Sequence, residues 1–184
     1  MDVAGRLFAE HGYHGTSIRM LADACGLRSA SLYSHFAGKE QLFVEVVDRY
    51  FRAYLPALTD ASKADGTGAD RLASMIDVSV EVATAHRDAF LALTNDWSLI
   101  RRNEQLADLL AGRNDANECW ATVLEAGVAD GSLRADVEPG AALWILYSAI
   151  VGMIGERHGD GRGVPAVPST PTLVRVLLGG LATD

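Results

Sequence analysis

Apolar residues recur along most of this chain at intervals of three and four positions. This spacing places them on one face of an α-helix, whereas the strict alternation that marks half-buried strands is not sustained anywhere. Glycines and prolines separate the periodic segments. The pattern therefore predicts an all-α fold.

The periodic segments also predict where each helix lies. Turns containing glycine at 11–15 and 25–27 separate the first three helices, and Thr16 and Ser17 are placed to cap the second. Residues 64–68 and the Gly- and Pro-rich residues 158–171 are predicted to be connections. The predicted helices span 3–10, 18–24, 29–36, 39 to about 56, 69–84, 87–100, 104–129, 139–156 and 172–181.

A length of 184 residues suits a small head that shares its core with a larger helical body. We place the head at 1–47 and the body at 48–184. The net charge of -8 argues superficially against a polyanionic partner. However, five Lys and Arg nearly balance six Asp and Glu in residues 1–50, so -7 of the charge falls in 51–184. A dimer would present the small basic surface between Arg19 and Lys39 twice.

The composition excludes several classes of protein. Hydrophobic residues make up 49% and charged residues 22%, as in ordinary globular proteins. The apolar run over 141–155 is shorter than the roughly 20 residues of a transmembrane helix, and no basic-then-apolar leader opens the sequence. Cys25 and Cys119 have no zinc-ligand or disulfide spacing. We therefore expect a cytoplasmic protein with no membrane span, metal or other cofactor.

The most informative stretch is 7–42, which reads LF and then GYHGTSIRMLADACGLRSASLYSHFAGKEQL. Two short helices joined by a tight turn at Gly26 have the geometry of a helix-turn-helix, whose second helix enters the major groove of DNA. Small side chains on the outer face would let the backbone approach the base edges. The predicted shared core is Leu7, Phe8, Ile18, Leu21, Ala22, Leu27 and Leu32, and the outer face is Arg28, Ser29, Ala30, Ser31 and Ser34.

This stretch resembles the DNA-binding domain of the TetR (tetracycline repressor) family. The resemblance covers roughly the first quarter of the chain, and the remainder matches the family in helix order and length. It implies a reading head on a helical ligand-binding and dimerising body, and the role of a ligand-released repressor. The matching residues are Leu7, Phe8, Gly12, Tyr13, Thr16, Ser17, Ile18, Leu21, Ala22, Gly26, Leu32, Tyr33, His35, Phe36, Lys39, Glu40 and Leu42.

Two positions depart from the usual pattern of the family. Arg28 stands where a small capping residue is usual, and Ala30 where glycine is common. We therefore expect Arg28 to reach a phosphate or a guanine edge at the expense of a weaker helix cap. The sequence starts inside the first predicted helix, so the basic residues that often precede this helix are either missing or not included, and contacts of a flanking arm with DNA stay open.

The predicted DNA contacts gather on and around the second and third helices. Tyr33, His35 and Lys39 are similar to phosphate-contacting positions of the family, and beside a helix N-terminus they would form a phosphate clamp. The alternative is that Tyr33 and His35 are surface residues that pack on Phe36. The predicted DNA-binding set is Thr16, Ser17, Arg28, Ser29, Ala30, Ser31, Tyr33, His35 and Lys39.

The predicted ligand contacts lie in the body. Arg113 and Asn117 interrupt an apolar stripe of the long helix, and burying them without a partner would be costly. That partner is either a ligand or an internal carboxylate such as Asp77 or Asp96. The preceding helix carries residues that would line the same cavity, although a tryptophan such as Trp97 more often belongs to the core. The predicted ligand set is Asn95, Trp97, Arg101, Arg113, Asn117, Trp120 and Tyr147.

The kind of ligand follows only from the resemblance. The stretch from Asn95 to Arg113, with Gly131 and Arg134, is similar to family members that respond to acyl-coenzyme A thioesters. This similarity favours a large amphipathic acyl ligand as the inducer.

The segment over 141–155 is apolar nearly all round, as expected of a helix covered on more than one side. Ser148, Gly152 and Gly155 permit close helix approach, and residues 173–178 offer a second apolar surface. In the TetR family the last two helices pair with their counterparts as a four-helix dimer interface, whereas the alternative is an internal core only. We expect a homodimer on a palindromic operator of double-stranded DNA, released by a small-molecule inducer.

Two other classes of protein stay open. An enzyme would need a nucleophile, base or metal constellation, and the sequence has no HExxH, GxSxG, phosphate loop or paired carboxylates with an obvious role. We therefore expect no enzyme. The second alternative is an all-helical interaction module that has kept the head and lost DNA binding. A salt-dependent shift of a DNA fragment carrying the protein's own upstream region distinguishes both from a regulator.

Overall fold

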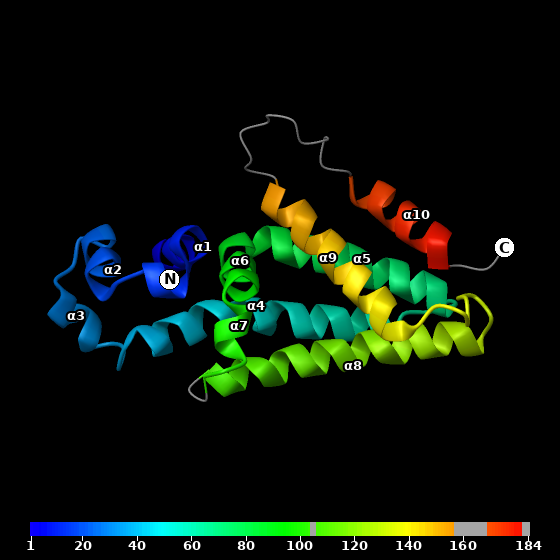
Figure 1. Cartoon of the computed structure of the whole chain (residues 1–184), viewed down its shortest axis with the longest axis horizontal. Coiled ribbons are helices and arrows are strands. Elements are labelled where there is room, and N and C mark those ends of the chain that lie inside the picture. The colour runs from blue at the N-terminus through cyan, green and yellow to red at the C-terminus, as the bar shows by residue number, and fades with distance from the viewer. Residues whose placement is uncertain (104–105, 157–168, 182–184) are drawn as a thin grey trace. The chain divides into compact units, whose positions relative to one another are not determined.

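The computed structural model describes residues 1–103, 106–156 and 169–181, and every regular element in these ranges is helical (Figure 1). The prediction of an all-α fold is therefore confirmed. The predicted helix start at 104 and most of the predicted connection over 158–171 lie outside the described residues. The helices are α1 (Asp2–Gly15), α2 (Ile18–Ala24), α3 (Ser29–Tyr33), α4 (Lys39–Ser62), α5 (Gly68–Ala85), α6 (Arg87–Asn95), α7 (Trp97–Ile100), α8 (Ala107–Ala129), α9 (Pro139–Glu156) and α10 (Thr170–Leu181).

The chain divides into two compact units. Unit 1 consists of Met1–Ala53 and His86–Arg113, and unit 2 of Tyr54–Ala85 and Asn114–Asp184. The long helices α4 and α8 contribute residues to both. The division from sequence, 1–47 and 48–184, stays a prediction about functional domains. Unit 1 differs from the predicted head because α6, α7 and the start of α8 pack with it.

Unit 1 is built around aromatic side chains. The rings of Phe8 and Tyr13 both meet Phe43 edge-on, with centroids 5.1 and 5.3 Å apart, and α1 packs along α6 (Figure 1). Leu21 and Leu32 are buried as expected and join α2 to α3. The prediction that Leu27 belongs to this core is wrong, because its side chain lies in the turn after α2 and is 46% exposed.

The first helix and the helix predicted over 87–100 differ from their predicted limits. α1 continues past residue 10 to Gly15, with a kink at Gly12, whose φ of 68° and ψ of 171° are not helical. Glycine suits this position because a positive φ is costly for residues with a Cβ. The single helix predicted over 87–100 is broken at Asp96, which ends α6 and precedes α7.

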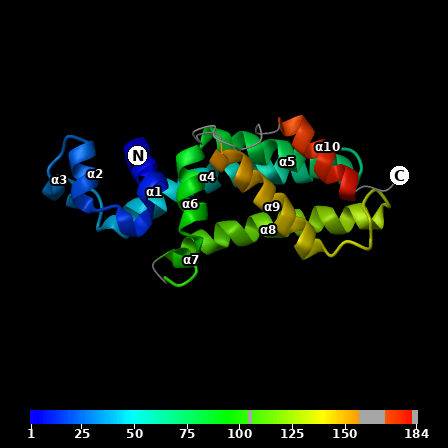
Figure 2. The same ribbon diagram turned by 45° about the horizontal axis from the view of Figure 1, so that its top comes forward.

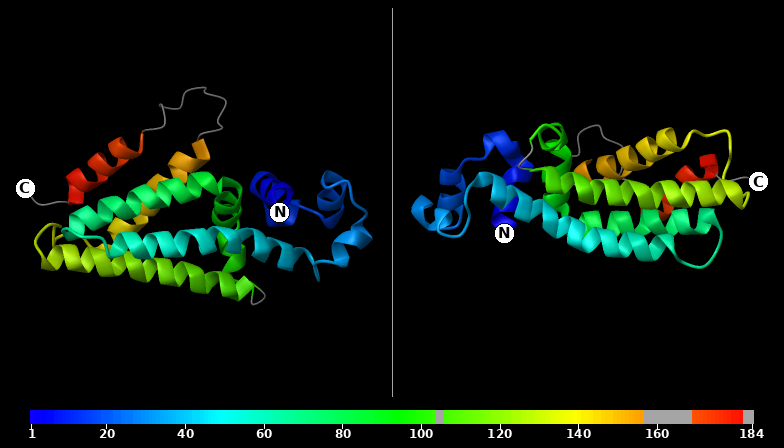
Figure 3. Two further views of the ribbon diagram at one scale, coloured as in Figure 1. Left: turned by 180° about the vertical axis from the view of Figure 1, so that it is seen from behind. Right: turned by 90° about the horizontal axis from the view of Figure 1, so that it is seen from below.

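Unit 2 is a helical bundle. α9 and α10 both contact α5 (Figure 2), and the end of α4 runs beside α8 (Figure 3), where the indole N–H of Trp120 donates to the Tyr54 hydroxyl. Leu58, Leu72 and Ile154 are among its fully buried side chains. None of the helices in the described ranges combines the length and the apolar character needed to cross a membrane.

The start of α5 is capped by polar side chains near and far in sequence. Thr67 and Asp70 form a reciprocal capping box, in which each side chain accepts the other's backbone N–H. The N–H groups of Gly68 and Ala69 donate to Asp130 and Ser132, beyond the end of α8. The hydroxyl of Thr67 lowers the pKa of Asp70, and that of Ser132 lowers the pKa of Asp130. These contacts satisfy donors that a helix leaves open at its first turn.

Candidate DNA-binding interface and ligand site

The helix-turn-helix forms through local capping and turn chemistry. The Ser17 side chain accepts the backbone N–H of Met20 at 3.1 Å, which confirms Ser17 as the cap of α2. Gly26, with a φ of 67°, reverses the chain after α2. Arg28 then stands at the cap position of α3 and makes no capping hydrogen bond through its side chain. The weaker cap expected at Arg28 is therefore present.

Most of the predicted DNA contacts point to solvent in unit 1. Ser29 is half-buried, and the end of the predicted third helix, at Ser34 and His35, is a turn because α3 stops at Tyr33. Tyr33 is 57% exposed, so its hydroxyl is accessible. The exposed members of the predicted set are Ser17, Arg28, Ala30, Ser31, Tyr33 and His35.

Two residues of the predicted DNA-binding set form hydrogen bonds within unit 1 instead. Thr16 is fully buried, and its hydroxyl lies within hydrogen-bond distance of the carbonyl oxygens of Leu7 and Gly12. The Lys39 ammonium donates to the carbonyl oxygens of Tyr13 and Thr16 at 2.8 and 2.9 Å. The Thr16 side chain therefore cannot reach DNA, and Lys39 serves to hold the turn between α1 and α2.

The predicted ligand residues fall into two groups. Unit 1 holds Asn95, Trp97, Arg101 and Arg113. Here the Arg113 guanidinium lies 4.2 Å from the centre of the Trp97 ring, a cation–π contact. Asn95 donates from its amide to the carbonyl oxygen of Ala9, and Arg101 is exposed.

Unit 2 holds Asn117, Trp120 and Tyr147. The prediction that Asn117 is buried on an apolar face is wrong, because its side chain is exposed. One residue earlier, Ala116 takes the buried position. Trp120 is buried and Tyr147 is half-buried.

A buried chain of hydrogen bonds adds Tyr54 and Ser79 to the candidate residues of unit 2. Trp120 Nε1 lies 3.2 Å from the Tyr54 hydroxyl, which lies 3.1 Å from Ser79 Oγ. Ser79 donates onward to the carbonyl oxygen of Met75, so Tyr54 donates to Ser79. Burial raises the pKa of Tyr54. Sequence reasoning missed Ser79, although a serine between Met75 and Val80 on an apolar helix face is the signal that marks it.

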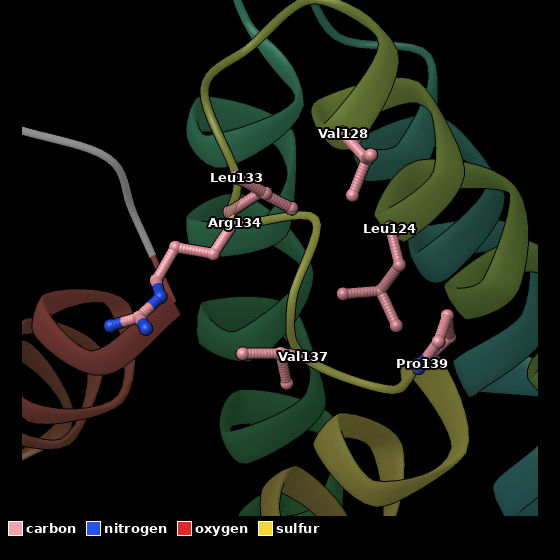
Figure 4. A pocket seen from close by; sticks show the side chains of 6 residues that line it. All are labelled: Leu124, Val128, Leu133, Arg134, Val137 and Pro139. Atoms are coloured by element: carbon pink, nitrogen blue, oxygen red, sulfur yellow. The ribbon is translucent and has the colours of Figure 1, made fainter.

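A small pocket lies near the end of α8 and the start of α9 (Figure 4). Its empty volume is about 260 Å³, including space open to solvent. Arg134 points its guanidinium away from the apolar walls (Figure 4) and binds both carboxylate oxygens of Asp136. The lining of this pocket consists of Leu124, Val128, Leu133, Arg134, Val137 and Pro139.

The helix α9 has one buried and one exposed face. Leu146 and Ile154 are buried in unit 2, whereas Trp144 is 70% and Ile145 49% exposed. Ser148, Gly152 and Gly155 continue the same exposed face. Trp144 and Ile145 give this exposed face two large apolar side chains. We name the exposed face formed by residues 144, 145, 148, 152 and 155 the α9 face.

A helix-turn-helix with an accessible second helix, followed by a helical bundle, defines a class of protein, the DNA-binding transcriptional regulators. Residues 1–46 match the model described as bacterial regulatory proteins of the tetR family, and residues 65–155 match the tetracyclin repressor-like C-terminal domain. The chain belongs to the TetR family of bacterial regulatory proteins.

Curated relatives agree with this assignment. The HTH-type transcriptional repressor KstR2 of Rhodococcus jostii is 31% identical over 188 residues, which cover 100% of this chain and 89% of that protein. KstR2 of Mycolicibacterium smegmatis is 32% identical over 143 residues, 75% of this chain and 67% of that protein. Both relatives are repressors, not enzymes.

Solved structures show the same fold. The ketosteroid transcriptional regulator KstR2 of Mycobacterium tuberculosis has a TM-score of 0.86 at 21% identity, covering 100% of this chain and 93% of that one. AibR in complex with isovaleryl coenzyme A and operator DNA has a TM-score of 0.78 at 19% identity, covering 98% and 94%.

Proposed function

We propose that this protein is a dimeric cytoplasmic repressor that binds a palindromic operator through α2 and α3 and leaves it when an acyl-coenzyme A thioester binds the body. The observation that carries the DNA-binding part is the accessible face of α3, where small side chains flank Arg28. Such a surface brings the helix backbone close to base edges. The relatives named as repressors support the direction of regulation.

The proposed DNA contacts are revised by the structure. Ser17, Arg28, Ala30, Ser31, Tyr33 and His35 are exposed, and Ser29 is accessible in part. Arg28 has the reach and the bidentate donors to read a guanine. Tyr33 and His35 follow at the end of α3, where hydroxyl and imidazole groups suit phosphate oxygens. Two such heads in a dimer would occupy successive major grooves about 34 to 36 Å apart.

Substituting Arg28 with alanine tests the reading surface. We expect a cost of about 1 to 3 kcal/mol at one base position of each half-site, and a relaxed preference at that position. The measurement is binding to operator fragments that the wild type has selected from a random DNA pool, each with a single base changed. The matched control is Arg52→Ala, since Arg52 is an exposed arginine of α4 that pairs with Asp48. A loss spread evenly over all sequences would make Arg28 a phosphate contact.

The ligand part of the proposal rests on the chemistry of unit 1. Trp97 and Arg113 combine an aromatic face with a cation, a pairing suited to the adenine and phosphate groups of coenzyme A. The complex of AibR with isovaleryl coenzyme A supports this class of ligand.

Release of the protein from operator DNA by added thioesters tests the proposed class of ligand. Isovaleryl-coenzyme A and a longer acyl thioester should release wild-type protein, whereas coenzyme A alone should be much weaker. Arg113→Met keeps the bulk of the side chain and removes its charge, so operator binding should survive while release needs roughly tenfold more thioester. Arg52→Met is the control. Equal release of wild type and Arg113→Met at equal operator affinity would remove Arg113 from the site.

A further inference from the structure

Tyr13, at the turn between α1 and α2, is held from several directions within unit 1. Its backbone N–H donates to Asp96 Oδ2 at 2.7 Å, and its hydroxyl donates to Glu40. The Lys39 ammonium donates to its carbonyl oxygen and lies 4.2 Å from the centre of its ring. Tyr13 is only 4% exposed. The partners come from α4 and from the α6–α7 corner, which is 83 residues away in sequence.

Asp96 meets a need that the local sequence creates. The non-helical backbone of Gly12 interrupts α1, and the N–H of Tyr13 follows directly after this kink. A buried N–H without an acceptor costs free energy. The carboxylate supplies the acceptor, and its oxygens lie 3.6 and 3.7 Å from the point where a Cβ on Gly12 would stand. Asp96 therefore accepts the N–H that follows the kink at Gly12, and it lies close to that glycine.

The charge of Asp96 is held at a cost. Burial raises the pKa of this carboxyl group, while the Tyr13 N–H and the nearby His14 and Lys39 act in the opposite direction. The surroundings of Asp96 therefore favour its ionised form less than water does. An asparagine would accept the same hydrogen bond without this penalty. The hydrogen bond between the Tyr13 N–H and Asp96 is specific, yet it is weakened by the desolvation of the carboxylate. Such a bond suits a contact that has to break during function.

Asp96 also connects the turn to the α7–α8 segment. Its carbonyl oxygen accepts the N–H groups of Leu99 and Ile100, so its backbone is part of the first turn of α7. Trp97 follows directly, and the Arg113 guanidinium lies on the Trp97 ring. Asp96 therefore joins the N–H of Tyr13 to the backbone of α7, and Arg113 packs on the next residue of that helix.

We propose that Asp96 is the positioning residue through which the α7–α8 segment sets the geometry of the α2–α3 pair: with Asp96 on Tyr13 the reading helices hold the operator spacing, and loss of this contact frees them. The inference rests on the proposed DNA-binding function. It identifies the contact through which a change in the packing of Trp97 against Arg113 would alter the geometry of α2 and α3.

The first test uses hydrogen exchange and needs no DNA. Asp96→Ala should raise the exchange rate of the Tyr13 amide by about tenfold or more, as expected for the loss of a charged acceptor. Asp96→Asn should restore most of the protection. Trp97→Ala, which removes the ring that Arg113 packs on, should also raise Tyr13 exchange, whereas Asp88→Asn, a matched change on α6, should leave it unchanged. Unchanged Tyr13 exchange in either Asp96→Ala or Trp97→Ala would overturn the proposal.

The second test separates positioning from stability. Wild type first selects its operator from a random DNA pool, and fragments are then made with the two half-sites one base pair closer or farther apart. Asp96→Ala should lose about tenfold in affinity for the selected spacing and discriminate less between spacings. An equal loss at every spacing with a lower Tm would make Asp96 merely structural and overturn the proposal. Failure of the wild type to select any DNA would contradict the proposed function, and the exchange test would still decide the role of Asp96.

Discussion

Replacing Gly152 with tryptophan is expected to turn the protein into a monomer and to lower its operator affinity by about 10² to 10⁴-fold, because each head alone forfeits the second half-site. Gly152 lies on the exposed α9 face, and a Cβ there would meet no atom within 4 Å. The bulky side chain therefore fits the single chain and blocks only a second helix that packs on this face. Sedimentation and operator binding measure the two effects.

The control for this experiment is Glu118→Trp, which adds an equally bulky side chain at an exposed position of α8 in the same unit. It should remain a dimer with normal operator affinity. Both variants should melt close to wild type once the effect of dissociation on Tm is taken into account. An intact dimer in Gly152→Trp would place the interface away from the α9 face and contradict the proposed assembly.

Replacing Gly68 with alanine is expected to destabilise the fold by about 3 kcal/mol, the upper end of the usual cost of overpacking. A Cβ on Gly68 would lie 2.1 Å from Cα and 2.5 Å from N of Gly127 in α8. Backbone atoms cannot turn aside as the end of a side chain can, so α5 and α8 must separate or the first turn of α5 must unwind. Calorimetry should show a Tm lowered by about 6 to 12 °C.

Gly179→Ala serves as the comparison, because a Cβ at this helical position meets nothing within 4 Å. Its Tm should stay equal or rise slightly, since alanine favours helix more than glycine does. Operator contacts of Gly68→Ala should be normal at temperatures where the chain is folded, because Gly68 lies in unit 2. A normal Tm in Gly68→Ala would show that the two backbones do not approach as closely as the structure places them.

Local chemistry explains why much of the head was predictable. Ser17 caps α2 and Gly26 reverses the chain after it, and both roles depend on neighbours a few residues away. The exposure of Arg28 and Tyr33 follows from the same pattern, because the buried positions of α2 and α3 define the opposite face. Hydrophobic periodicity likewise located α5, α9 and α10 to within a few residues.

Residues that act across the fold were assigned less well. Lys39 and Thr16 were predicted to face DNA, yet both bind carbonyl oxygens of the α1–α2 turn. Asn117 was predicted to lie on the apolar stripe of α8, but Ala116 occupies the buried position there and Asn117 is exposed. The direction of a polar side chain depends on which acceptors other helices bring near it, and sequence spacing alone does not contain that information.

The sequence by itself determined the all-helical fold, the helix-turn-helix and the membership of a family, since these depend on periodicity, caps and turns within short stretches. Only the tertiary structure decided that Asp96 meets Tyr13, that Trp120 joins Tyr54 and Ser79, and that Gly68 meets Gly127. Each of these contacts joins residues far apart along the chain. Their partners are selected by helix packing, which brings together side chains that no local pattern relates.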